Sequence, residues 1–132
     1  MFDSPEHTFE EVIRTDGRYP REAFAFMQDV LARAVKKVHG ETELPPGKRH
    51  VTGRQLCLAM RELAVDNWGL LARLVLERWN IRATIDLGNM VYLLIENDLM
   101  AKTEEDSIED FRDVYDFADA FELDENFHLT GE

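Results

Sequence analysis

Apolar residues recur at intervals of three and four along most of this chain, the spacing typical of amphipathic helices. A short first helix is expected over residues 4–14. A longer one should run from Pro20 to Gly40, where a glycine suits a left-handed stop. The pattern therefore predicts an N-terminal helix pair over residues 4–40, followed by a loop over residues 41–50.

The clearest helix start in the chain lies at Thr52. Thr52 and Gln55 have the spacing of a capping box, in which each side chain accepts a hydrogen bond from the other residue's backbone N–H. Val51 and Leu56 occupy the two positions of a hydrophobic staple. The sequence thus predicts that a central unit, residues 51–102, opens with a firmly fixed helix.

Two more helices are expected in this central unit. The first should begin after Asp66-Asn67 and stop at Asn80. It carries the apolar residues Leu70, Leu71, Leu74, Val75 and Leu76. The second should run from Thr84 to about Asn97, and Gly88 inside it, about 1 kcal/mol less favourable than Ala, indicates close packing against a neighbour. This order of helices, with a short extended end, resembles a helix-turn-helix followed by a stub of a wing.

The last segment, residues 103–132, mixes apolar and acidic side chains. Ser107 and Asp110 offer a capping pair, and the positions that follow predict an amphipathic helix over residues 108–122 with carboxylates on its other half. The expected fold is therefore mainly α, a single domain over residues 1–132. It should be a helical bundle with a helix-turn-helix or winged-helix-like centre and a C-terminal acidic amphipathic helix.

Charge is distributed very unevenly along the chain. The formal net charge is -12, and residues 103–132 hold twelve Asp and Glu against one base, Arg112. The stretch from Lys48 to Arg82 is locally basic, with seven bases against three acids. The acidic segment can dock on that stretch, or it can be a free arm that binds a basic partner protein. The candidate interaction residues of such an arm are Phe111, Asp113, Tyr115, Asp116 and Phe121.

Composition narrows the classes of function. A pI near 4.7 argues against binding to nucleic acid or anionic membranes, because both require dense Lys and Arg. The first residues show neither a basic stretch nor an apolar run, and no segment reaches roughly 18 uninterrupted apolar residues, so a cytoplasmic location is expected. The single cysteine, Cys57, cannot form an internal disulfide and is expected to be a small core residue.

No motif predicts a catalytic residue, a cofactor or a bound metal. Gly-rich phosphate loops, nucleophile elbows and the His-Glu-x-x-His pattern do not occur. Glu125 and His128 have the spacing of half a di-iron site, but such a site needs two halves. His50 directly precedes the helix start at Thr52 and is expected to make a local hydrogen bond rather than act as a base.

The leading expectation is a non-enzymatic interaction or regulatory module that uses an acidic surface. Two alternatives are open. One is a small carboxylate-based metal protein or enzyme, which a pocket containing His50 would favour. The other is a winged-helix-like nucleic-acid-binding protein that uses the basic stretch.

Several phrases of the sequence together carry a resemblance to a known family. They are Tyr19-Pro20-x-Glu22-Ala23-Phe24, His50-Val51-x-Gly53-x-x-Leu56-Cys57, Gly69-Leu70-x-Ala72-Arg73-x-Val75-Leu76-Glu77-x-Trp79, Asp86-Leu87-Gly88-x-x-Val91-Tyr92 and Asp106-Ser107-x-x-Asp110-Phe111-x-Asp113-Val114-Tyr115-Asp116-Phe117. This combination, over about residues 9–121, resembles a family of conserved hypothetical bacterial proteins known mainly from planctomycetes and verrucomicrobia. The resemblance implies a small, free-standing bacterial cytoplasmic protein whose acidic, aromatic end belongs to the family pattern. It implies no activity, ligand or site residue.

Overall fold

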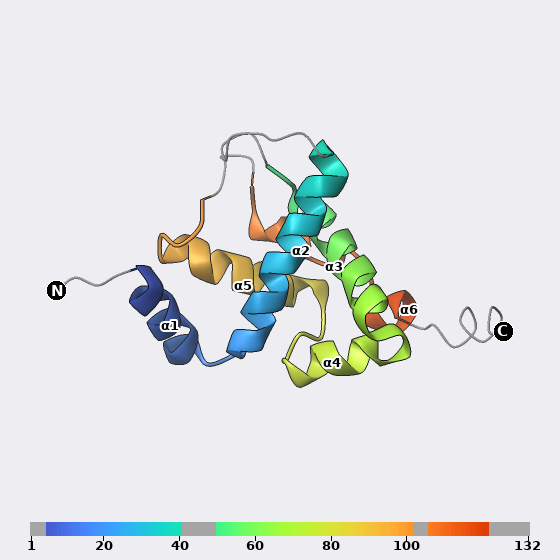
Figure 1. Ribbon diagram of the computed structural model, residues 1–132, viewed down its shortest axis with the longest axis horizontal. Coiled ribbons are helices and arrows are strands. Elements are labelled where there is room, and N and C mark those ends of the chain that lie inside the picture. The colour runs from blue at the N-terminus through green and yellow to red at the C-terminus, as the bar shows by residue number, and fades with distance from the viewer. Residues whose placement is uncertain (1–4, 41–49, 102–105, 122–132) are drawn as a thin grey trace.

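The computed structural model describes residues 5–40, 50–101 and 106–121 (Figure 1). The chain is mainly helical, as the sequence predicts, and no strand occurs among these residues. In order, the elements are α1 (Pro5–Asp16), α2 (Arg21–His39), α3 (Gly53–Trp68), the 3-10 turn η2 (Gly69–Leu71), α4 (Ala72–Arg78), α5 (Thr84–Glu96), the 3-10 turn η3 (Ile108–Phe111) and α6 (Phe117–Ala120). None of the described helices is both long and apolar enough to cross a membrane.

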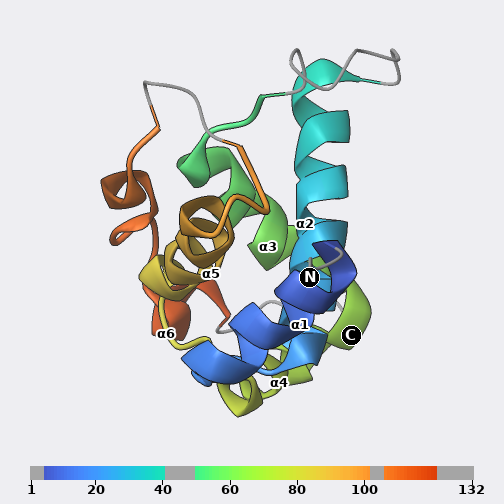
Figure 2. The same ribbon diagram turned by 90° about the vertical axis from the view of Figure 1, so that its left-hand side faces the viewer.

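Helix α2 supplies the longest wall of the core. Its buried residues recur at helical spacing and include Ala23, Phe24, Met27, Val30 and Ala34. This stripe faces α3, and in Figure 2 α2 stands beside α3. The predicted boundaries hold here, because Pro20 precedes the first turn and Gly40 ends the helix at a φ of 75°.

The predicted capping box at the start of α3 is confirmed. The Gln55 backbone N–H donates to Thr52 Oγ1 at 3.1 Å, and the Thr52 N–H donates to Gln55 Oε1 at 2.8 Å. Val51 and Leu56 are both buried, as the staple requires. These contacts fix the direction in which the chain enters α3 from His50.

The end of α3 differs from the prediction. The helix continues to Trp68, Gly69 breaks it at a φ of 53°, and η2 and α4 follow. In α4, Ala72 and Leu76 are the buried residues. Three of the apolar residues expected in this stretch, Leu70, Leu71 and Leu74, are 59%, 58% and 55% exposed. A helix this short has one inward face, and those three leucines lie on the other.

The acidic end of the chain departs furthest from its prediction. The expected helix over residues 108–122 is wrong, because the segment forms η3, a turn with Asp113 at a φ of 52°, and then the short α6. A continuous helix would place Asp113, Asp116 and Asp119 three residues apart on one exposed face, where like charges repel. The broken path keeps the segment against α3 and α5 instead (Figure 2).

The likeness to a helix-turn-helix stays a prediction. Helices α3, α4 and α5 follow each other in the expected order, and Asn80 ends α4 in the left-handed region at a φ of 67°. On α5, however, polar side chains serve the fold: Asp86 Oδ1 accepts from the Tyr19 hydroxyl at 2.6 Å, and Asn89 donates to that hydroxyl at 3.2 Å. These two side chains are engaged with the segment before α2.

Candidate functional site

An open groove with a volume of about 780 Å³ lies between α2, the start of α3, α5 and the segment around η3. Its walls are mainly apolar, and the main contributors are Leu31, Val35, Leu56, Val91, Ile95 and Phe111. Small-molecule sites typically measure about 300–1,000 Å³ and combine apolar walls with a few polar groups. The groove therefore has the size and lining of a small-molecule site.

The polar residues that line the groove include two carboxylates. Asp106, Ser107 and Asp110 line it from the segment that leads into η3, and His50 lines it from the segment before α3. His50 Nε2 lies 3.2 Å from Asp106 Oδ1. The partner of this histidine is therefore distant in the sequence, whereas a local hydrogen bond was expected. None of the described residues that line the groove is Lys or Arg.

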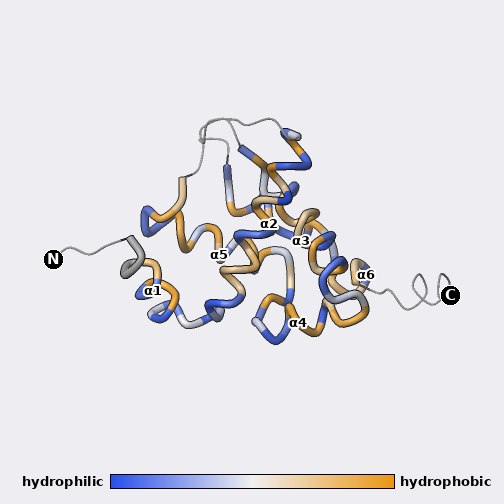
Figure 3. Tube along the Cα trace, viewed as in Figure 1, coloured by the Kyte–Doolittle hydropathy of each residue, from blue (hydrophilic) through white to orange (hydrophobic). Residues whose placement is uncertain are grey.

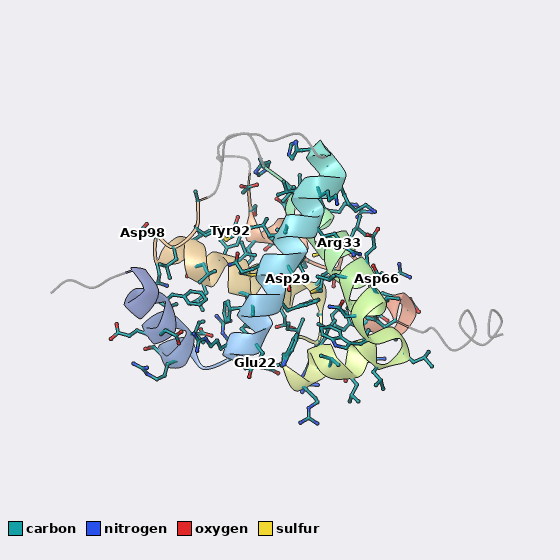
Figure 4. All side chains as sticks on the ribbon, in the orientation of Figure 1. Glu22, Asp29, Arg33, Asp66, Tyr92 and Asp98 are labelled. Carbon is teal, nitrogen blue, oxygen red and sulfur yellow. The ribbon has the colours of Figure 1, made fainter. Side chains whose placement is uncertain are left out.

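Tyr92 on α5 brings a hydroxyl group into this environment (Figure 4). The hydroxyl oxygen is buried, and within the described residues no group hydrogen-bonds to it. Burial, with the nearby carboxylates of Asp106 and Asp110, raises the pKa of Tyr92, so the phenol stays protonated at neutral pH. A protonated phenol both donates and accepts, and leaving it unpaired costs about 1–3 kcal/mol. The groove thus lies beside a buried hydroxyl that has no partner among the described residues.

The wall formed by η3 is firmly attached to α5. The Ser107 and Asp110 capping pair is present: Ser107 Oγ accepts from the Glu109 N–H at 3.1 Å, and Asp110 Oδ2 from the Ser107 N–H at 3.2 Å. The buried Thr84 hydroxyl donates to the Phe111 carbonyl oxygen at 2.6 Å. This wall is therefore held by hydrogen bonds at both its start and its end.

Two glycines receive the Phe111 side chain. A Cβ added at Gly88 would lie 2.8 Å from Phe111 Cβ and Cγ, and one added at Gly53 would lie 2.8 Å from Phe111 Cε1. The close packing predicted at Gly88 is confirmed, and Phe111 is the neighbour. The aromatic ring also meets Tyr92 edge to face, with ring centroids 6.4 Å apart.

The five candidate interaction residues divide into two sets. Phe111 and Phe121 are buried, at 3% and 6% exposure, and the Tyr115 hydroxyl donates to the Cys57 carbonyl oxygen at 2.6 Å. These aromatic side chains are engaged within the protein and do not form an exposed anchor, so residues 106–121 dock on the body of the chain rather than extending from it as a free arm. Asp113 and Asp116 are exposed.

The basic stretch meets this segment differently from the expectation. Arg61 donates to the Ala120 carbonyl oxygen at 2.9 Å rather than to a carboxylate. Arg73 pairs with Glu77 on its own helix at 2.8 Å. A second hollow of about 520 Å³ brings Asp113 together with Arg54 and Arg112. Apolar packing and backbone hydrogen bonds, rather than salt bridges alone, hold the acidic segment.

The remaining candidate positions carry little chemistry. Cys57 is fully buried, and that burial raises the pKa of its thiol to about 12, consistent with a small core residue. No group of three or more His, Cys, Asp or Glu suited to a metal occurs within residues 5–40, 50–101 and 106–121. Glu125 and His128 lie outside the described residues.

Sequence reasoning did not find the groove. Its residues come from four separate segments, and no local motif joins them. The sequence does not single out Tyr92 as a site residue. The polar side chains of Asn89 and Tyr92 among the apolar residues of α5 are a weak signal that this helix is not purely a core element.

No family model, curated protein or solved structure matches this chain. The resemblance noted from the sequence therefore stays a prediction.

Proposed function

We propose that the protein is a non-enzymatic binding module whose acidic segment forms one wall of a groove for a small, amphipathic, positively charged molecule. The observation that carries the proposal is the composition of the groove. Among the residues that the structure describes, its walls are mainly apolar and its charged lining residues include two carboxylates and no Lys or Arg. A ligand of this kind would place its apolar part between α2 and α5 and its cationic group near Asp110.

The proposal retains the expected class, an interaction module that uses acidic side chains, and changes the surface. The aromatic side chains of the segment pack inward, whereas Asp106 and Asp110 border the groove. A cation near these carboxylates gains Coulomb energy in a partly desolvated site, where the interaction exceeds that in bulk water. The Tyr92 hydroxyl, which has no hydrogen-bond partner among the described residues, lies beside the same groove.

A matched series of eight-carbon compounds tests the proposal: octylammonium, octanol and octanoate. Titration into isotopically labelled full-length protein, followed by amide NMR shifts, gives both affinity and location. Octylammonium should bind at least tenfold more tightly than octanoate, with shifts confined to the groove-lining parts of the chain: α2, residues 50–56, α5 and residues 106–111. Equal affinity for the two ions, or shifts elsewhere on the protein, would sink the proposal.

Variants of the chain separate the groove from general acidity. Ala32→Phe places a ring into the groove from an exposed position on α2 and should abolish octylammonium binding. Asp110→Asn keeps an oxygen for the Ser107 N–H but removes the charge, and should weaken binding by about tenfold, or about 1.4 kcal/mol. Glu22→Gln, which removes an exposed acid near the start of α2, should leave binding unchanged and is the matched control (Figure 4).

The position of His50 favours a second candidate, a small proton-transfer enzyme. A histidine paired with a carboxylate, as His50 is with Asp106, is a common arrangement for a general base. Hydrolysis of p-nitrophenyl esters by wild type and His50→Gln distinguishes this candidate. Saturable turnover above that of free imidazole, lost in the variant, would favour the enzyme, and equal slow rates would favour the binding module.

A further inference from the structure

His50 and Asp106 meet in the lining of the groove, where separate segments of the chain come together. His50 Nε2 lies 3.2 Å from Asp106 Oδ1, and both residues line the groove. The carbonyl oxygen of His50 lies 2.7 Å from Nε2 of His39, at the end of α2. Two residues after His50, Thr52 caps α3. The backbone of His50 is therefore held on both sides, and its ring meets Asp106 in a defined position.

The His50 ring can gain or lose a proton while the protein stays folded. The side chain of His50 is 38% exposed and that of Asp106 is 18% exposed, so water reaches the pair. Histidine is the side chain whose charge ordinarily changes between pH 5 and 8, whereas ordinary carboxylates are ionised throughout that range. A change of pH within this range therefore alters the charge of the groove lining through its histidine.

The other charged and titratable groups around His50 come from three elements. Those that contact it or line the groove with it are His39 from α2, Tyr92 from α5, and Asp106 and Asp110 from the segment that enters η3. Burial, and then the carboxylates of Asp106 and Asp110, raise the pKa of Tyr92, so the phenol stays neutral and both acids act on the same part of the groove. Among the described residues no Lys or Arg lines this groove, and Arg54 of α3 lines the second hollow instead.

We propose that pH controls ligand binding in the groove through His50, whose protonated ring lowers the affinity for a cationic ligand. This inference rests on the proposed function and concerns its regulation. The neutral ring leaves the two carboxylates to attract the cation. The protonated ring adds one positive charge beside Asp106, which offsets part of that attraction and repels the ligand. The affinity for a cation should therefore rise between pH 5.5 and 8, by about fivefold or more.

The apolar walls of the groove should not respond to this change of pH. Leu31, Val35 and Ile95 carry no titratable group, and they lie on α2 and α5. Figure 3 shows hydrophobic and hydrophilic stretches alternating along both helices, so each helix can give an apolar side to the groove. A neutral ligand of the same length should therefore bind equally well at either pH, whereas a cation should not.

Titrations of octylammonium and octanol into the full-length protein at pH 5.5 and pH 8, followed by methyl NMR shifts, test the inference. An alkylammonium group, like that of Lys with a pKa of about 10.4, stays charged at both values. Wild type should bind octylammonium about fivefold more tightly at pH 8 and octanol equally at both. His50→Gln should bind octylammonium equally at both, and His50→Arg, which fixes a positive charge, should bind it weakly at both.

The linkage between ligand and proton gives a second readout. If protonation of His50 opposes the ligand, the bound ligand must oppose protonation of His50 by the same free energy. Saturating octylammonium should therefore move the change in the His50 ring signals to lower pH, and octanol should leave it in place. Ring signals that octylammonium does not move would contradict the inference.

His39→Gln is the matched control, because His39 contacts the His50 backbone but is not among the residues that line the groove. This variant should keep the pH dependence of wild type. Equal affinity of wild type for octylammonium at both pH values would overturn the inference, and so would a pH dependence that survives in His50→Gln or disappears in His39→Gln. A lack of octylammonium binding at both pH values would instead refute the proposed function, and this regulation with it.

Discussion

The hydroxyl of Thr84 donates to the carbonyl oxygen of Phe111 at 2.6 Å, across 27 residues of sequence. The same hydroxyl oxygen accepts from the Val114 N–H at 3.1 Å. Thr84 is fully buried in the first turn of α5. One side chain thus joins the acidic segment to the core at two backbone positions.

Thr84→Val should destabilise the protein by about 1.5–3 kcal/mol, because it keeps the shape of the side chain and leaves a carbonyl and an N–H without their partner. Urea denaturation measures the change in the free energy of unfolding. Thr15→Val, at an exposed position on α1, should stay within about 0.5 kcal/mol of wild type. An equal loss in the two variants would contradict the role given to Thr84.

Gly88→Ala should also destabilise the protein, by about 1–3 kcal/mol, although alanine is the better helix former. The added methyl group would lie 2.8 Å from Phe111 atoms, closer than carbon atoms approach. In a Phe111→Ala background the same substitution should cost much less, because the segment can then move. A double-mutant cycle measures the coupling, and strictly additive losses would show that Phe111 is not the obstacle.

The two tyrosines next to the acidic segment should respond differently to loss of their hydroxyl groups. Tyr115→Phe should cost about 1–2 kcal/mol, since its hydroxyl donates to the Cys57 carbonyl oxygen. Tyr92→Phe should be neutral or slightly stabilising in the absence of ligand, because its buried hydroxyl has no partner among the described residues. Thermal unfolding of both variants checks the contrast, and the reverse order would refute it.

Stability should fall at alkaline pH. Burial raises the pKa of the Cys57 thiol to about 12, from an ordinary value of 9.0, and burial followed by the hydrogen bond to Asp86 raises the pKa of Tyr19 to about 12. Above about pH 9 the unfolded chain therefore binds fewer protons than the native one. The stability present below that pH is then lost as pH rises toward 12, at up to about 1.4 kcal/mol per pH unit for Cys57.

Urea titrations between pH 7 and 11 measure this decline, and Cys57→Ala should remove the part that begins near pH 9. Absorbance at 295 nm gives an independent check. The pKa values of Tyr19, Tyr92 and Tyr115 are all raised, chiefly by burial, so phenolate should appear only as the protein unfolds. Phenolate absorbance at pH 10 in the folded protein would contradict this expectation.

The sequence predicted best the features that depend on neighbouring residues. The capping box of Thr52 and Gln55 needs only the spacing of two polar side chains, and the stop at Asn80 needs only a residue tolerant of positive φ. Tertiary contacts decided the rest. The apolar period after Asp110 suited a helix, but Phe111 is drawn into the space above two glycines and α6 is separately held by Arg61, so the helix breaks between them.

The exposed side of η2 and α4 and the groove could not be predicted from the sequence, for related reasons. The spacing of apolar residues predicts a helical stretch around Leu70 and Leu76, but it does not show which side of η2 and the short helix α4 meets the core. Tyr92 lies in a site only because Asp106 and Asp110, from another segment, come beside it. Neither relationship is encoded within a window of one helix.

Gly53 and Gly88 both pack against the Phe111 side chain, which is synthesised after them. The ribosome completes α2, α3 and α5 before it adds Phe111, and domains can begin to fold as they emerge. During that interval the space beside Gly53 and Gly88, which Phe111 fills in the complete chain, has no side chain in it. A chain that ends before Phe111 would therefore lack this wall of the groove.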